Sequence, residues 1–230
     1  MAITHATGFP ICAYSANGPA TLTISPATIG DLFIFSFEGQ TGHLTVATCP
    51  AFVSTANPSG AMTILPGVIP TTNVVVAYAT ITVTGSQTLT LTYNTAITGA
   101  YPSWIFDELT IGKAATWAAV SATLGNNHGT STGDVWTFPT DTSSYPALQA
   151  YWGAIDASNG TTAPYGSSTS GFSVTMCTGT GTLNPVIMNG ALTPSTSYSP
   201  VMTTGANGTV YAWEFIIQVV STQGLIASLL

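Results

Sequence analysis

The chain consists largely of short runs in which apolar residues alternate with threonine, and turn residues separate these runs. Residues 20–25 read ATLTIS and residues 88–93 read TLTLTY. A period of two places the apolar side chains on one face of a strand and the polar ones on the other. Gly, Pro and Asn recur between the runs, as they do in turns. The pattern predicts an all-β chain of many short strands.

Further apolar runs predict strands over residues 31–37, 73–84, 103–111, 135–138, 147–155, 172–177 and 209–220. Residues 31–37 (DLFIFSF) are apolar on both faces, which indicates a central strand. Residues 85–87 (GSQ) connect two runs and predict a hairpin of residues 73–84 with 88–93. Residues 114–124 (AATWAAVSATL) fit either a helix or a bulged strand, because their apolar residues recur at spacings of three and four.

Turn signals every ~8–15 residues without strand–helix alternation favour a jelly-roll-like antiparallel β-sandwich. We expect a single β-sandwich domain over residues 1–230. The polar segment 124–134 (LGNNHGTSTGD) is the alternative position for a boundary between two parts.

The last predicted strand, residues 209–220, has two faces of different character. Its odd-numbered residues share one face, which we expect to be core: Tyr211, Trp213, Phe215, Ile217 and Val219. Glu214 falls on the opposite, less apolar face. We therefore expect the Glu214 carboxylate not to be buried.

Charged residues make up only 4% of the chain, with one lysine, no arginine and a net charge of −7. Ordinary domains have about 25%. Nucleic-acid binding requires cations for the phosphates and is therefore excluded. No stretch of ~20 apolar residues predicts membrane insertion, and no secretory signal is expected at the start. Covering a surface of hydroxyls with another subunit costs little desolvation free energy, so we expect a homo-oligomer.

No motif predicts a catalytic residue, a cofactor or a metal site. The acids are Asp31, Glu38, Asp107, Glu108, Asp134, Asp141, Asp156 and Glu214. We interpret them as turn acids and solvated surface acids, although a pairing through space stays open. Asp107 and Glu108 are adjacent, so on a strand they point to opposite faces. The histidines His5, His43 and His128 are expected in loops, without metal-ligand spacing.

The three cysteines, Cys12, Cys49 and Cys177, show neither metal-ligand nor C-x-x-C spacing. An odd count with wide gaps favours small buried hydrophobes. A disulfide between two of them is the alternative.

Two groups of residues are candidates for contacts with partners. Six aromatic residues near predicted loops or strand ends could stack on a host-surface glycan: Tyr101, Trp104, Tyr145, Tyr151, Trp152 and Tyr165. The alternative is that these rings belong to the core or to a subunit interface. The apolar C-terminal segment is a candidate interface through Leu225, Ile226, Leu229 and Leu230. Alternatively, this segment folds back on its own sandwich.

Part of the chain resembles phage virion β-sandwich proteins. Residues 30–35 (GDLFIF) are similar to a strand opening common in that family. Tyr78, residues 84–92 (TGSQTLTLT), Glu108 and Gly112 are similar to the strands and turns that follow it. The resemblance covers residues 20–112. It implies a minor tail, fibre or capsid-decoration protein without catalytic residues.

The expected function is therefore that of a non-enzymatic virion structural protein, at the tail or the capsid surface, that binds itself and other virion proteins. One alternative is a carbohydrate- or receptor-binding module. Another is an extracellular filament or surface-layer subunit, which would lie on an extracellular surface instead of a virion.

Overall fold

The computed structural model describes residues 3–14, 21–38, 44–65, 75–93, 103–111, 115–123, 135–157, 166–167, 169–177, 183–203 and 208–219. The regular structure of these residues is β, apart from the 3-10 turn η1 (Pro50–Phe52). Every sheet is antiparallel. The predicted all-β, sandwich-like fold class is confirmed, whereas the jelly-roll strand order is not.

The first half of the chain forms two facing sheets. Sheet A has the order β1 (Thr4–His5), β9 (Ser103–Thr110), β4 (Leu32–Glu38), β7 (Val75–Thr80) and β6 (Thr63–Leu65), with β2 (Ile11–Tyr14) also paired to β9. Sheet B has the order β3 (Thr21–Ile24), β8 (Gln87–Tyr93) and β5 (Leu44–Thr48). Phe33 and Phe35 from sheet A and Leu89 and Leu91 from sheet B fill the space between them.

The second half forms a larger sheet with smaller ones beside it. Sheet C has the order β10 (Ala115–Thr123), β19 (Gly208–Val219), β13 (Ala147–Ala157), β16 (Leu183–Leu192) and β15 (Phe172–Met176). The smaller sheets are β11 (Val135–Thr137), β18 (Val201–Thr203) and β14 (Gly166–Ser167), and then β12 (Asp141–Thr142) with β17 (Ser197–Tyr198). Trp136, Phe138, Tyr151 and Met188 belong to the core between them.

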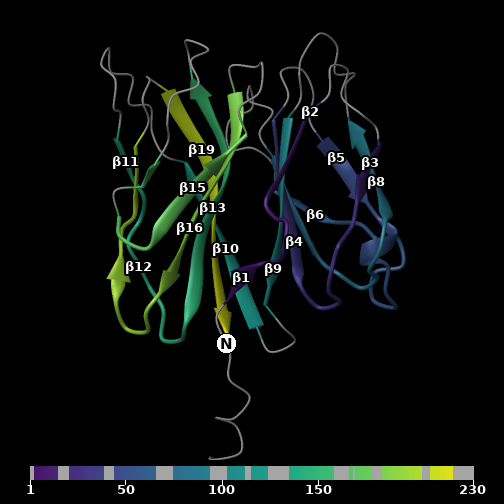
Figure 1. The fold of residues 1–230 in the computed structure, drawn as a ribbon, viewed down its shortest axis with the longest axis horizontal. Coiled ribbons are helices and arrows are strands. Elements are labelled where there is room, and N and C mark those ends of the chain that lie inside the picture. The colour runs from purple at the N-terminus through teal and green to yellow at the C-terminus, as the bar shows by residue number, and fades with distance from the viewer. Residues whose placement is uncertain are drawn as a thin grey trace, which may run out of the picture.

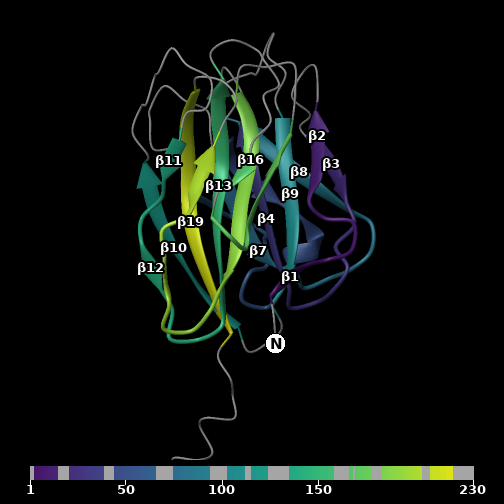
Figure 2. The ribbon, with the colours of Figure 1, turned by 60° about the vertical axis from the view of Figure 1, so that its left-hand side comes forward.

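Sheets A and C pack against each other, so the two halves stand side by side, the first half in purple to teal and the second, from β10 onward, in teal to yellow (Figures 1 and 2). Ile34 and Ile105 from sheet A meet Trp152 and Phe215 from sheet C in one cluster. Both sheets are therefore covered on two faces. This explains why residues 31–37 are apolar on both faces, as the central-strand prediction requires.

The predicted hairpin of residues 73–84 with 88–93 is wrong. Strand β7 pairs with β4 and β6 in sheet A, whereas β8 pairs with β3 and β5 in sheet B. The connection between them crosses from one sheet to the other. Buried Ile81 fixes this crossing, because its backbone N–H donates to the carbonyl of Asp31 at 2.9 Å.

For residues 114–124, the strand alternative is the correct one. Strand β10 pairs with β19 along its whole length, from Ala115 opposite Val219 to Thr123 opposite Tyr211. The repeated apolar spacing that fits a helix is therefore overridden by pairing with a long neighbouring strand.

The facing of β19 is only partly as predicted. Phe215 and Ile217 are buried and Trp213 is half-buried, which agrees with a core face. The expectation for Glu214 is wrong, because this residue is 1% exposed. Strand β19 lies inside sheet C, and sheet C has sheet A on one side and the core around Trp136 on the other. The Glu214 side chain is therefore covered by the second of these layers.

Segment 124–134 lies outside the described residues. The alternative boundary within it, and the single domain over residues 1–230, stay predictions.

Candidate functional site at the junction of the two halves

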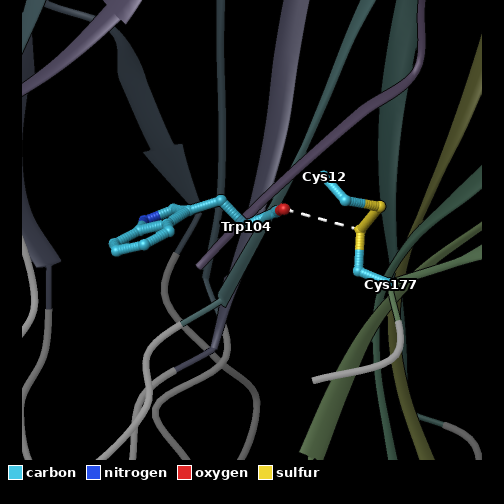
Figure 3. Close-up of a disulfide and its surroundings, with 3 residues drawn as sticks. All are labelled: Cys12, Trp104 and Cys177. Carbon is cyan, nitrogen blue, oxygen red and sulfur yellow. Dashed lines mark hydrogen bonds between the residues drawn. A yellow bond between two sulfur atoms is a disulfide. The ribbon is translucent and has the colours of Figure 1, made fainter. Parts of the chain in front are cut away.

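A disulfide joins the two halves of the chain. Cys12 in β2 is bonded to Cys177, which follows β15 directly, with Cα atoms 5.6 Å apart. Cys177 is buried, and its sulfur lies 3.5 Å from the carbonyl oxygen of Trp104 (Figure 3). The interpretation of the cysteines as small buried hydrophobes is thus wrong for Cys12 and Cys177. It is right for Cys49, which is free and buried.

A polar bridge crosses the same junction. The two carboxylate oxygens of Asp107 in β9 lie 2.9 and 2.8 Å from Nδ1 of His5 in β1. On the other side of the ring, Nδ2 of Asn189 in β16 lies 3.2 Å from Nε2. In the neutral imidazole, Nδ1–H donates to Asp107 and Nε2 accepts from Asn189. Sheets A and C are therefore connected through one imidazole ring.

The two ionisable groups of this bridge favour a bound proton. The hydrogen bond that His5 donates to Asp107 and the charge of that carboxylate raise the pKa of His5 above its usual value, against the effect of burial. Burial raises the pKa of Asp107, while the hydrogen bond from His5 lowers it. Both directions follow from placing a carboxylate at zero exposure beside a single half-buried base. The expectation that His5 sits in a loop is wrong, because it lies in β1.

The chemistry open to this bridge is limited by its partners. Both ring nitrogens of His5 already face a protein group, Asp107 on one side and Asn189 on the other. The hydroxyl of Ser173 lies 3.5 Å from Oδ1 of Asn189, and the amide of Asn189 faces the imidazole. The arrangement fixes the orientation of sheets A and C relative to each other. It holds a proton between His5 and Asp107.

A close backbone contact completes the junction. The hydroxyl of Ser36 in β4 donates to the carbonyl oxygen of Gly153 in β13 at 2.6 Å. Gly153 has no room for a side chain, because an added Cβ would lie 1.7 Å from the carbonyl oxygen of Tyr211. The middle of β13 therefore requires glycine at this position.

Glu108 has its own partners, separate from those of Asp107. Its carboxylate accepts from the backbone N–H groups of Ala27, at 2.9 and 3.1 Å, and Thr28, at 3.0 Å. Burial raises its pKa, and these hydrogen bonds oppose the rise. The two adjacent carboxylates thus fix different segments, in line with the prediction that they point to opposite faces of the strand.

A second buried polar cluster lies on the far face of sheet C. Tyr151 donates its hydroxyl to Oε1 of Glu214 at 2.5 Å, and Nε2 of Gln149 lies 2.8 Å from the same oxygen. The same Nε2 lies 2.8 Å from Oδ2 of Asp141. Burial and the neighbouring Asp141 raise the pKa of Glu214 to about 7. Burial also raises the pKa of Tyr151. The pairing of carboxylates left open by the sequence is that of Asp141 with Glu214.

Most of the acids whose side chains the structure describes lie inside the protein. Of the five carboxyl side chains that the structure describes, Asp141 is half-buried, and the other four, Asp31, Asp107, Glu108 and Glu214, are at most 1% exposed. The interpretation of these four as turn or surface acids is therefore wrong. Removing them from the surface leaves it less charged than the composition alone indicates.

The structure describes four of the six candidate glycan-contact aromatics. Trp104, Tyr151 and Trp152 are at most 1% exposed, so no ring face is available to a sugar. These three rings belong to the core, which is the alternative that the sequence analysis gives for them. Tyr145 is 47% exposed. Tyr101 and Tyr165 lie outside the described residues, as do the candidate interface residues Leu225, Ile226, Leu229 and Leu230.

Gln149 and Asn189 are site residues that sequence reasoning missed. Each lies in a strand, opposite partners that come from distant parts of the chain. A polar amide within an otherwise apolar run is the only signal that marks Gln149, in residues 147–155.

Comparisons of the chain with protein-family models, with curated proteins and with solved structures find no match. Within the described ranges, no group of three or more His, Cys, Asp or Glu side chains could hold a metal ion. None of the helical structure in those ranges is long and apolar enough to span a membrane.

Proposed function

We propose that the protein is a non-enzymatic structural subunit of a bacteriophage-like virion, at the tail or the capsid surface, which assembles with further copies of itself and with other virion proteins. The observation that carries the proposal is the distribution of charge. Four of the five described carboxyl groups are buried, while the threonine side chains of β3 and β8 are exposed.

The outer face of sheet B is an example of such a neutral surface. Thr21 and Thr23 of β3 lie opposite Thr90 and Thr88 of β8, and all four are exposed. Covering a hydroxyl costs far less free energy than covering an ion, because a hydroxyl can exchange water for a neighbouring hydroxyl or carbonyl. A second subunit can therefore pack on this face without removing water from a charge.

The junction supports a location outside the cytosol. Disulfides persist in oxidising surroundings, and the Cys12–Cys177 disulfide links the first half of the chain to the second. This agrees with a virion and also with an extracellular surface. The choice of a virion rests on the resemblance of residues 20–112 to phage β-sandwich proteins.

Two measurements test the proposal. Mass spectrometry of purified particles should find this chain in many copies per particle. Light scattering of the isolated protein should show an oligomer that persists from low salt to about 1 M salt, because few ion pairs can hold it together. A stable monomer at high concentration, or absence from particles, would contradict the proposal. A lattice or fibre formed by this chain alone would favour the filament or surface-layer alternative.

A further inference from the structure

A cavity of about 300 Å³, lined by both apolar and uncharged polar residues, lies at the free end of sheet A, where the pairing of β6 with β7 stops. Thr63 is the first residue of β6 and lies opposite Tyr78, but β7 continues to Thr80. Before β6, the chain pairs instead with sheet B, through Ala61 opposite Thr48. The cavity is therefore the space left where the chain passes from the edge of one sheet to the edge of the other.

The walls of this cavity are fixed by the protein itself. Nδ2 of Asn57 donates to the carbonyl oxygens of Phe52 at 3.3 Å and Ala61 at 3.0 Å. The hydroxyl of Thr82 lies 2.9 and 2.7 Å from the carbonyl oxygens of Ala51 and Val53. A ligand entering the cavity would meet groups already in place, which reduces the entropy lost on binding.

Gly60 fixes the conformation of the loop that contains Asn57. It has a φ of +63°, and an added Cβ would lie 2.4 Å from the carbonyl oxygen of Cys49. Its own N–H donates to the carbonyl of Asn57 at 3.2 Å, and its carbonyl accepts from Cys49 N–H at 3.0 Å. The loop conformation that shapes the cavity therefore depends on this glycine.

The lining side chains are uncharged. Of the lining residues, Ser54, Asn57, Thr63, Thr80 and Thr82 carry hydroxyl or amide groups, and Phe52, Ala61, Tyr78 and Ala79 are apolar or aromatic. Tyr78 is half-buried and makes an edge-to-face contact with Phe215, with ring centroids 5.8 Å apart. The hydroxyls of Ser54, Thr63 and Thr80 can both donate and accept, whereas the Thr82 hydroxyl already donates to backbone carbonyls and can only accept from a ligand.

We propose that this cavity binds one residue of a neutral sugar, such as the terminal residue of a surface glycan. A sugar ring combines hydroxyls, which donate and accept, with an apolar face, which can pack on the apolar part of the lining. An ionic ligand would lose its water without gaining a countercharge from the lining. A wholly apolar ligand would leave the lining hydroxyls without partners. The volume is at the lower end for ligand sites and fits a monosaccharide unit.

The site differs from the aromatic glycan contacts expected from the sequence, and it does not depend on the proposed assembly. Affinity for a single sugar residue should be weak, with a Kd on the order of 1 mM.

The test is a titration of the ¹⁵N-labelled protein, followed by NMR, with a panel of neutral monosaccharides: hexoses, deoxyhexoses and N-acetylhexosamines. A hexuronate and a hexose phosphate serve as charged comparators. At least one neutral sugar should shift the resonances of the backbone amides of residues 54–63 and 78–82. These shifts should reach a plateau as the sugar concentration rises. The charged sugars should bind at least ~10-fold more weakly.

Variants identify the groups responsible. Thr63→Val and Thr80→Val together replace two hydroxyls by methyl groups of the same shape, and they should raise the Kd about 10-fold. Thr23→Val with Thr90→Val makes the same change on the outer face of sheet B and should leave the Kd unchanged. Equal melting temperatures of the two double variants show that the pocket variant is folded. If its melting temperature is lower, the single variants Thr63→Val and Thr80→Val are titrated in its place. The proposal is overturned if no neutral sugar shifts these amides at about 50 mM, if charged sugars bind equally well, or if the pocket variant binds like the wild type.

Discussion

Cys12 and Cys177 are separated by 165 residues and are bonded to each other across the junction of sheets A and C. The loop that they close contains nearly all of the first half, whereas β16, β17, β18 and β19 of the second half lie outside it. Closing a long loop reduces the conformational freedom of the unfolded chain, and the stabilisation increases slowly with loop length. The bond therefore stabilises the packing of one half on the other more than it stabilises either half alone.

Replacing both cysteines, as Cys12→Ser with Cys177→Ser, should lower the free energy of unfolding by about 2–5 kcal/mol. The melting temperature should fall by ~5–15 °C for a chain of this size. A reducing agent should lower the melting temperature of the wild type to that of the double variant and leave the variant itself unchanged. Cys49→Ala is the matched control, since it removes the free thiol and should respond to reduction like the wild type. Equal melting curves with and without reductant would contradict this role.

Local pattern predicted the strands well, because the side-chain period of a strand is a property of neighbouring residues. The runs at residues 20–25, 31–37 and 103–111 became β3, β4 and β9 within one or two residues. Strand partners were not predictable in the same way. The GSQ turn looks like a hairpin turn, yet β7 and β8 belong to different sheets, because each completes a different apolar face.

The polar sites were less predictable because their chemistry depends on burial. Glu214 is the only acid in its run and sits on the less apolar face, which normally indicates solvent. Its burial results from a second layer around Trp136 that the sequence of β19 does not encode. The pairing of Asp107 with His5 likewise depends on β1 lying beside β9, 102 residues away along the chain.

The protein should be more stable at mildly acidic pH than at alkaline pH. The pKa of Glu214 is raised from 4.5 to about 7, so the folded chain binds more protons than the unfolded chain between these values. The free energy of unfolding then decreases as pH rises through this window. The raised pKa values of Asp107 and Glu108 act in the same direction. The stabilisation from protonated His5 is complete below pH 6.5 and is lost as pH rises through its raised pKa. Melting temperatures measured from pH 5 to pH 8 should therefore fall, and a rise over this range would contradict the assignment.

Glu214→Gln should remove most of this pH dependence at little cost. A glutamine keeps an oxygen that accepts from Tyr151, and its amide can donate to Asp141 without carrying a charge. At pH 8 the variant should melt no lower than the wild type. Glu214→Ala leaves the buried Tyr151 hydroxyl and Gln149 amide without this acceptor and should cost about 2–4 kcal/mol. The proposed role of the carboxyl group fails if both variants destabilise the protein equally.

The His5 bridge should contribute measurable coupling between the halves. Double-mutant cycles over His5→Ala and Asn189→Ala should give an interaction free energy of roughly 0.5–1.5 kcal/mol at pH 8, since these two side chains touch across the sheets. His5→Ala alone should cost more, about 2–3 kcal/mol, because it leaves the buried Asp107 carboxylate without its partner. A cycle of Asn189→Ala with Thr23→Ala, which lie in different parts of the fold, provides the control and should give no interaction. Coupling no larger than in this control would contradict the bridge.

Trp152 and Trp213 lie directly opposite each other on β13 and β19, which allows the same substitution to be compared at two degrees of burial. Trp152 has zero exposure and makes an edge-to-face contact with Phe215, with centroids 5.4 Å apart. Trp213 is half-buried beside the same cluster. Trp152→Ala should cost about 3–5 kcal/mol, because it opens a cavity in the cluster between sheets A and C. Trp213→Ala should cost about half as much, because part of its ring is already in contact with water. Denaturant unfolding of the two variants measures both values, and a larger loss for Trp213→Ala would place the packed centre of the junction on β19 instead of β13.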